Sequence, residues 1–290
     1  MKPSPFEYHA PRSVDEVVAL LSSLENSRLL AGGQSLMAMM NMRFATPDHV
    51  IDLNRVDGLS SIRLTPTHLE IGAMTRQRDI EFSKEIEAKL PIITEAIKHV
   101  GHRQTRNRGT IGGSLCHLDP SAELVTICSL LDASVTIAGR AGTRTIPFSD
   151  LPSGYLTTSL ESDECVTGVS IPLWPSPHGS SFVEVSRRHG DFATVSAGVM
   201  LELGPQGLVT RLAVALGGME FAPVRMTVLE ERLVGTALSE DAIANIGGAF
   251  DHLEPLDDVH ATSKYRRRLA VTMTQRAMRT AARRALDSRV

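Results

Sequence analysis

Apolar residues near the start of the chain are spaced as in an amphipathic helix. The stripe consists of Val14, Val17, Val18, Leu21 and Leu24. Ser13 and Glu16 form a capping box in front of it, and the helix is predicted to end near Asn26. The chain therefore opens with a helix that has one buried face.

Shorter apolar or alternating runs follow, and they predict strands over residues 28–31, 49–53, 69–73, 133–138, 143–146 and 165–171. Helices are predicted over residues 76–82, 91–100 and 121–131, with Pro91 suited to a first helical turn. Asp57 and Gly58 mark a turn, and we place a break between two α/β subdomains near residues 55–60. The first part of the chain is predicted to be a mixed α/β domain.

A proline- and serine-rich stretch at residues 172–181 is the clearest break in composition. We therefore predict one domain over residues 1–176 and a second over residues 177–290. The second contains three consecutive predicted strands over residues 182–186, 195–203 and 208–216, then helices over residues 224–234, 240–250 and 263–286. The predicted fold class is α+β, and its second domain is a three-stranded sheet with a helix bundle.

Composition narrows the possible functions. The chain has 290 residues, 42% of them hydrophobic and 22% charged, with a formal net charge of −3. This charge gives no reason to expect nucleic acid or an anionic membrane as partner. We find neither a signal peptide nor an apolar run long enough to span a membrane, so a cytoplasmic location is expected. Cys116, Cys128 and Cys165 cannot supply the four thiolates of an ordinary iron–sulfur cluster.

Two similar glycine-containing strings stand out. Ala31-Gly32-Gly33-Gln34-Ser35-Leu36 and Thr110-Ile111-Gly112-Gly113-Ser114-Leu115 each pair adjacent glycines with a serine and a leucine. Glycine lets a ligand approach the backbone, and a run of amide groups at a loop or helix start binds anions. Neither GxGxxG after a strand nor GxxxxGK[ST] is present. The pair predicts a single diphosphate-bearing ligand that is held from two sides, although glycine pairs are more often ordinary turns.

Residues 99–108 allow several interpretations. His99 and His102 have a spacing that could place both on a metal ion, but no third ligand of matching type lies nearby, so we expect no metal site. Arg103, Arg106 and Arg108 either offset the charge of a diphosphate or form a solvated or partner-facing patch.

Five strings together resemble the FAD-binding medium subunit of molybdenum hydroxylases. This family includes carbon monoxide dehydrogenase, quinoline oxidoreductase and nicotine or ketone dehydrogenase types, and its flavin domain also occurs inside xanthine dehydrogenase. The strings lie at residues 1–8, 31–36, 106–115, 119–123 and 186–193, in the order found in the family. The resemblance implies a vanillyl-alcohol-oxidase (PCMH)-type FAD-binding domain, then the C-terminal domain of carbon monoxide dehydrogenase flavoproteins.

The resemblance also implies which residues bind FAD. The set is Ala31, Gly32, Gly33, Gln34, Ser35, Leu36, Thr110, Ile111, Gly112, Gly113, Ser114, Leu115, His117, Glu123, Arg188, Asp191 and Phe192. Within it, Glu123 takes the place of an acidic residue that bonds FAD hydroxyls. Phe192 is expected to cover one face of the isoalloxazine, although its loop could instead be a structural turn held by Asp191.

By the same resemblance the chain is an electron-transfer subunit of a larger complex. A molybdenum cofactor is expected on a large partner subunit and two [2Fe-2S] clusters on a small one, in a dimer of heterotrimers. FAD on this chain would pass electrons to an external acceptor, and no side chain here need act as acid or base. An N-heterocyclic substrate is favoured over carbon monoxide. The alternatives are a carbon monoxide dehydrogenase subunit, a self-contained flavin oxidoreductase, or a scaffold that has lost FAD.

Overall fold

A computed structural model describes residues 1–175 and 177–288. The N-terminal strands form a small parallel sheet in the order β1 (Glu7–His9), β3 (His49–Asp52), β2 (Ser27–Leu30). Helix α1 (Val14–Ser23) covers it, and the Ser13 hydroxyl caps α1 by accepting the Glu16 amide at 3.2 Å. Ser13 is the N-cap as predicted, but the Glu16 carboxylate accepts the amide of Arg12 at 2.8 Å, so the second bond of the capping box is shifted by one residue. Helix α1 ends three residues before Asn26 because Leu24 is already extended. The short helices α2 (Leu36–Asn41) and η1 (Leu53–Arg55) follow β2 and β3.

A second, fully antiparallel sheet has the order β4 (Ile62–Leu64), β5 (His68–Gly72), β10 (Cys165–Pro172), β6 (Ser134–Gly139), β7 (Gly142–Pro147). The turn η2 (Phe148–Asp150) and the small pair β8 (Pro152–Gly154) and β9 (Thr157–Thr158) lie between β7 and β10. This sheet and its helices pack around buried aliphatic residues such as Ile71, Ile92 and Val135.

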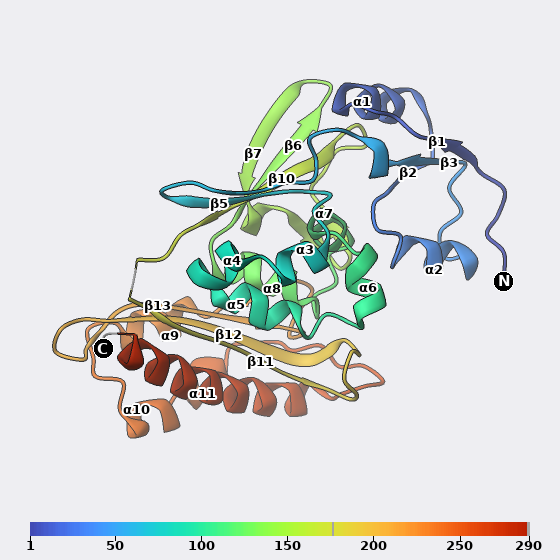
Figure 1. The fold of residues 1–290 in the computed structure, drawn as a ribbon. Coiled ribbons are helices and arrows are strands. Elements are labelled where there is room, and N and C mark those ends of the chain that lie inside the picture. The colour runs from blue at the N-terminus through green and yellow to red at the C-terminus, as the bar shows by residue number, and fades with distance from the viewer. Residues whose placement is uncertain (176, 289–290) are drawn as a thin grey trace.

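Six helices lie in the chain between β5 and β6: α3 (Gln77–Glu81), α4 (Lys84–Lys89), α5 (Pro91–Ile97), α6 (Arg103–Arg108), α7 (Ile111–His117) and α8 (Glu123–Leu130). In space they lie between this five-stranded sheet and the C-terminal sheet (Figure 1). Helices α4 and α6 were missed from the sequence, since their residues are polar and no apolar stripe reveals them.

The C-terminal sheet is antiparallel in the order β11 (Gly179–Ser186), β12 (Ala193–Leu203), β13 (Val209–Gly217), β14 (Val224–Arg225). It has four strands, not the three expected, because Val224–Arg225 pairs with β13 and helix α9 (Thr227–Leu233) begins only afterwards. The helix predicted over residues 240–250 is divided into α10 (Glu240–Ala244) and η3 (Gly247–Phe250), since Asn245 and two glycines interrupt it.

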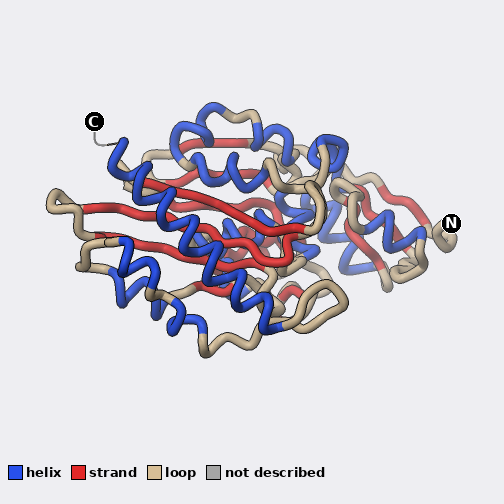
Figure 2. Tube along the Cα trace, turned by 90° about the horizontal axis from the view of Figure 1, so that it is seen from below, coloured by secondary structure: helices blue, strands red, loops and turns tan. Residues whose placement is uncertain are grey.

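Both faces of the C-terminal sheet are covered. The long helix α11 (Ser263–Asp287) crosses one face (Figure 2), while α5 and α8 contact the other. A Cβ on Gly179 would lie 1.9 Å from the Ala281 carbonyl oxygen, so α11 touches β11 at its backbone. Phe182, Met200 and Ala213 of this sheet belong to the same buried cluster as the first sheet and its helices. The two halves of the chain therefore share one buried cluster, and the C-terminal half has a second cluster of its own on the α11 side of its sheet.

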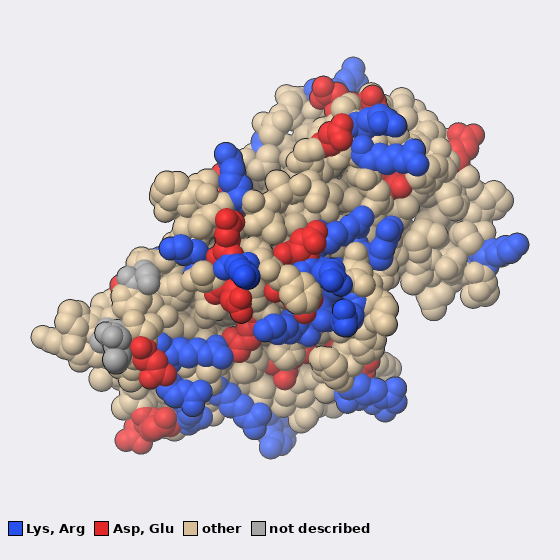
Figure 3. Space-filling view, in the orientation of Figure 1, with Lys and Arg blue, Asp and Glu red and all other residues tan. Residues whose placement is uncertain are grey.

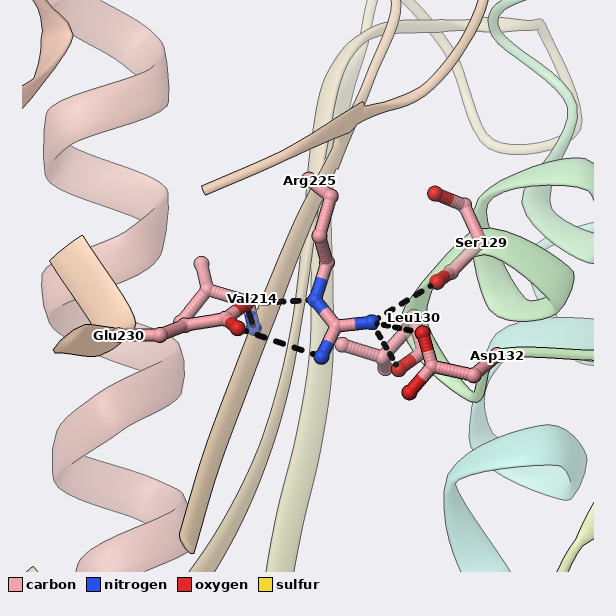
Figure 4. A network of polar contacts seen from close by, with 6 residues as sticks. All are labelled: Ser129, Leu130, Asp132, Val214, Arg225 and Glu230. Carbon is pink, nitrogen blue, oxygen red and sulfur yellow. Dashed lines mark hydrogen bonds and ion pairs between the residues drawn. The ribbon is translucent and has the colours of Figure 1, made fainter. Parts of the chain in front are cut away.

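Polar contacts also join the two halves. The Arg225 guanidinium donates to the carbonyl oxygens of Ser129 and Leu130, each at 3.1 Å, and pairs with Asp132 and Glu230 (Figure 4). Basic and acidic side chains are interspersed on the face in Figure 3. None of the described helices has the length and apolar character needed to cross a membrane. The predicted domain break falls at Ser176, which lies outside the described residues.

Candidate functional site

The two glycine loops meet in space. A Cβ built on Gly32 would lie 2.2 Å from the carbonyl oxygen of Arg108 and 2.8 Å from the Cα of Gly109. One built on Gly113 would lie 3.4 Å from the Cβ of Ala31. The first loop packs directly on the segment that leads into the second, and only glycine fits at position 32.

The first loop leaves a run of backbone donors without partners. Gly33 has a φ of +74°, and within the described residues no hydrogen bond uses the amides of Gly33, Gln34, Ser35 or Leu36. Ser35 precedes α2 without making a side-chain cap, while the Gln34 amide group donates to the Gly32 carbonyl oxygen at 3.3 Å. Successive free amides after a left-handed residue suit an anionic oxygen.

The second loop uses its amides within the fold. Ile111 and Gly112 donate to carbonyl oxygens in the segment after β5, at 3.2 and 2.8 Å. The buried Thr110 is the N-cap of α7, and its hydroxyl accepts the Gly113 amide at 3.0 Å. A Cβ on Gly112 would lie 2.7 Å from that of Ala73, so packing explains this glycine. The two loops look equivalent in sequence, but the amides of residues 111–114 are already bonded.

An arginine and an asparagine that the sequence analysis did not single out tie the loops together. Arg76 donates to the carbonyl oxygen of Arg108 and to the side chain of Asn54. Asn54 in turn donates to the carbonyl oxygen of Ala31 at 3.0 Å. The only sequence signal was an arginine at the start of a predicted helix, which says nothing about its distant partners. These contacts fix the spacing of the two loops.

A buried titratable group lies at the start of α8. Glu123 is 3% exposed, and its burial raises the pKa of its carboxyl to about 8. Glu184, on β11, acts in the same direction and is itself buried, with His99 Nδ1 at 3.4 Å from its Oε1. The hydrogen bond to Glu184 raises the pKa of His99. Glu123 therefore carries a proton at neutral pH and can donate to a hydroxyl as well as accept from one.

The three arginines around α6 differ in their surroundings. Arg106 is buried and pairs with Glu81 through two hydrogen bonds of 2.8 and 3.1 Å. Arg103 and Arg108 are exposed. Arg106 is thus neutralised inside the protein, so only the other two can meet a ligand or a partner.

The turn between β11 and β12 reaches the first half of the chain. A Cβ on Gly190 would lie 2.5 Å from the ring of His102, so the turn rests on the start of α6. Arg188 and Asp191 are exposed, and Phe192 is 60% exposed. No described hydrogen bond uses the Asp191 carboxylate; the backbone bond from Asp191 to Arg188 and the Ser186 hydroxyl hold the turn.

The remaining predicted site residues lie on α7. Ser114 and His117 are partly exposed, and within the described chain neither side chain has a hydrogen-bond partner. Leu115 is buried in the core beneath them. The structure therefore brings together the two loops and α7. It places Glu123 and the turn around Phe192 beside α5 and α6.

Comparisons with known proteins show the family to which the chain is similar. Residues 4–174 match the FAD binding domain in molybdopterin dehydrogenase, and residues 180–281 match the CO dehydrogenase flavoprotein C-terminal domain. The chain is 37% identical to the 6-hydroxypseudooxynicotine dehydrogenase complex subunit alpha of Paenarthrobacter nicotinovorans, over 98% of this chain and 97% of that one. It is 35% identical to the carbon monoxide dehydrogenase medium chain of Hydrogenophaga pseudoflava, over 97% and 98%.

Solved structures give the same result. A carbon monoxide dehydrogenase structure from Hydrogenophaga pseudoflava matches with a TM-score of 0.94 at 36% identity, over 98% of this chain and 99% of that one. Quinoline 2-oxidoreductase from Pseudomonas putida 86 matches with a TM-score of 0.94 at 34% identity, over 99% and 100%. The resemblance noted in the sequence is thereby confirmed, and the chain belongs to the FAD-binding medium subunits of molybdenum hydroxylases, as an oxidoreductase subunit.

Proposed function

We propose that this subunit binds FAD with the diphosphate against the first glycine loop and transfers electrons through it. The observation that carries the proposal is the run of unbonded amides from Gly33 to Leu36, fixed against the second loop by Arg76 and Asn54. Charge-assisted bonds from such amides to phosphate oxygens are among the stronger hydrogen bonds in proteins. Bound FAD supplies the redox chemistry.

The other predicted site residues have supporting roles in this proposal. Ser35 and Ser114 have hydroxyls that can bond the cofactor. Thr110 caps the N-terminus of α7, and His117 contacts the cofactor from the last turn of the same helix. Protonated Glu123 donates to a cofactor hydroxyl. Exposed Phe192 covers one isoalloxazine face and excludes water, while Arg188 holds the turn or stabilises the negative charge of the reduced flavin, and Asp191 lies beside Phe192 in the same turn.

We further propose that this subunit takes electrons from two [2Fe-2S] clusters on a small partner and passes them to an external acceptor. A large partner carries the molybdenum cofactor, and the complex is a cytoplasmic dimer of heterotrimers. Support comes from the related carbon monoxide dehydrogenase of Hydrogenophaga pseudoflava, which was solved in a form lacking the Mo-pyranopterin moiety of its molybdenum cofactor. The three cysteines of this chain are also too few for an ordinary cluster.

The substrate of the complex is proposed to be an N-heterocycle. Relatives include a nicotine 6-hydroxylase medium subunit, a caffeine dehydrogenase subunit and quinoline 2-oxidoreductase. The alternative is carbon monoxide, favoured by the 35% identity to two carbon monoxide dehydrogenase medium chains. A third alternative is that this chain is a self-contained flavin oxidoreductase that binds its own small substrate.

We propose that the chain forms two domains, the first with two subdomains. We place the main break between residues 176 and 177, supported by family matches that end at residue 174 and resume at residue 180. A subdomain break near residues 55–60 is supported by the separate three- and five-stranded sheets on its two sides.

Expression with and without the partner subunits tests this function. The isolated chain is expected to bind FAD stoichiometrically and to show no dehydrogenase activity. The reconstituted complex should reduce an artificial acceptor with nicotine or quinoline. Turnover by the isolated chain would overturn the electron-transfer role, and turnover with carbon monoxide alone would favour the alternative substrate.

A further inference from the structure

Three potential metal ligands converge on the edge of the N-terminal sheet. Glu7 and His9 are two residues apart on β1, so their side chains leave the same face of the strand. In the parallel pairing of β1 with β3, Glu7 lies opposite His49. Alternation along one strand and register with the next therefore place all three side chains together. His49 is 40 residues from His9 in sequence, so no motif with a short fixed spacing would identify this cluster.

The distances match a small tetrahedral site. His9 Nε2 lies 3.2 Å from His49 Nδ1, and His49 Nδ1 lies 3.4 Å from the Glu7 carboxylate. The three ligand atoms all lie within 4.8 Å of one another. With zinc–ligand bonds of about 2.0–2.1 Å, the edge of a tetrahedron is about 3.3–3.4 Å. An octahedral site with the same bonds has edges of about 2.9–3.0 Å, which fits less well.

His49 Nδ1 faces both the imidazole nitrogen of His9 and the carboxylate of Glu7. Without an ion, a hydrogen bond between the two imidazoles leaves the Glu7 carboxylate to solvent. A cation between the three atoms satisfies every lone pair at once.

We propose that Glu7, His9 and His49 bind one Zn²⁺ ion, with water as the fourth ligand. Two imidazoles and a carboxylate form a donor set that zinc accepts and that Mg²⁺ or Ca²⁺ do not prefer. The ion joins β1 to β3. Strand β1 is a three-residue edge strand, and its other face is held by the Tyr8 hydroxyl, which donates to Asp52 at 2.6 Å. The bound ion therefore holds an edge strand in place.

Zinc titration of the full-length chain tests this. The purified protein is stripped with a chelator, then titrated with ZnCl₂ against a chromophoric competitor, with thermal unfolding followed in parallel. We expect one Zn²⁺ per chain and a higher melting temperature when zinc is bound, because a ligand of the native state stabilises it. X-ray absorption should show only nitrogen and oxygen neighbours at about 2.0–2.1 Å.

Variants make the result decisive. His9→Ala and His49→Ala should each weaken binding by more than the roughly 10–100-fold cost of losing a residue that only supports a ligand. Glu7→Gln, at a side chain 74% exposed, should weaken binding without disturbing the fold. His252→Ala, an exposed histidine elsewhere, is the matched control and should bind normally. Absence of binding by the wild type, or unchanged stoichiometric binding by the His9→Ala/His49→Ala double variant or by Glu7→Gln, would overturn the proposal.

Discussion

Gly33 is the residue at which the first loop acquires its open amides. Its positive φ turns the backbone so that the next amides are not taken up by β2 or by the body of α2. A side chain at this position is strained by its backbone conformation, and a Cβ would lie 3.2 Å from Met37. Gly112, by contrast, is confined by Ala73, so a larger residue there threatens folding before it affects a ligand.

Gly33→Ala is therefore the sharper test of the flavin loop. We expect a folded protein whose FAD affinity falls at least about tenfold, because a shift of about 1.4 kcal/mol already has this effect. Gly58→Ala is the control, since Gly58 has a similar φ of +79° but open space around it. Both should lose similar stability from strain. The measurements are flavin absorbance after gel filtration and fluorescence titration; equal FAD affinity in both variants would contradict the loop assignment.

The buried carboxyl of Glu123 predicts that the free energy of unfolding falls as pH rises. Burial raises its pKa to about 8, so the folded chain keeps a proton that the unfolded chain releases near pH 4.5. The stabilisation is complete below the unfolded pKa and is lost as pH rises through about 8. In urea unfolding without FAD, the wild type should lose stability more steeply than Glu123→Gln from about pH 5 to about pH 8, the interval between the unfolded and folded pKa of Glu123. Parallel curves would show that the carboxyl is ionised in the folded state.

At the scale of elements, features that depend on neighbouring residues in the sequence could be predicted, and features that depend on distant residues could not. The apolar stripe of α1 and its Ser13 N-cap depend on neighbours in sequence and were predicted correctly. The unequal status of the two glycine loops depends on carbonyl oxygens after β5, far from the second loop in sequence. Helix α6 was missed because its buried Arg106 looks like a solvent residue until Glu81 is placed beside it. Non-local partners, not propensities, decided these cases.

The bridge between the two loops can be tested through Arg76. Arg76→Ala removes the contacts to Arg108 and Asn54, so the loops are no longer held at one spacing and FAD must order them. We expect FAD affinity to fall by roughly tenfold. Arg140→Ala, at an exposed arginine in the turn between β6 and β7, should leave it unchanged. Isothermal titration with FAD measures both, and equal affinities would remove the bridge from the site.

At the scale of the whole molecule, Arg225 connects the halves of the chain. Its side chain is 22% exposed, and Glu230 beside it is 12% exposed. Arg225→Ala leaves that carboxylate and two α8 carbonyl oxygens without their partner, so the free energy of unfolding should fall by about 2–4 kcal/mol. Arg63→Ala, which breaks an exposed pair with Glu70, should cost less than about 1 kcal/mol. Denaturant unfolding compares them; similar losses would make Arg225 an ordinary surface residue.

The buried cluster shared by the two halves predicts how the protein behaves when the chain is cut between them. Phe182, Met200 and Ala213 are buried in one cluster with the helices that precede residue 174. The two polypeptide halves are thus joined by packing as well as by the peptide link between them. A chain cut once at an engineered protease site near residue 176 should run as a single species in gel filtration and melt in one calorimetric transition. Separation of the fragments under native conditions would show instead that the peptide link, and not the buried packing, holds the two halves together.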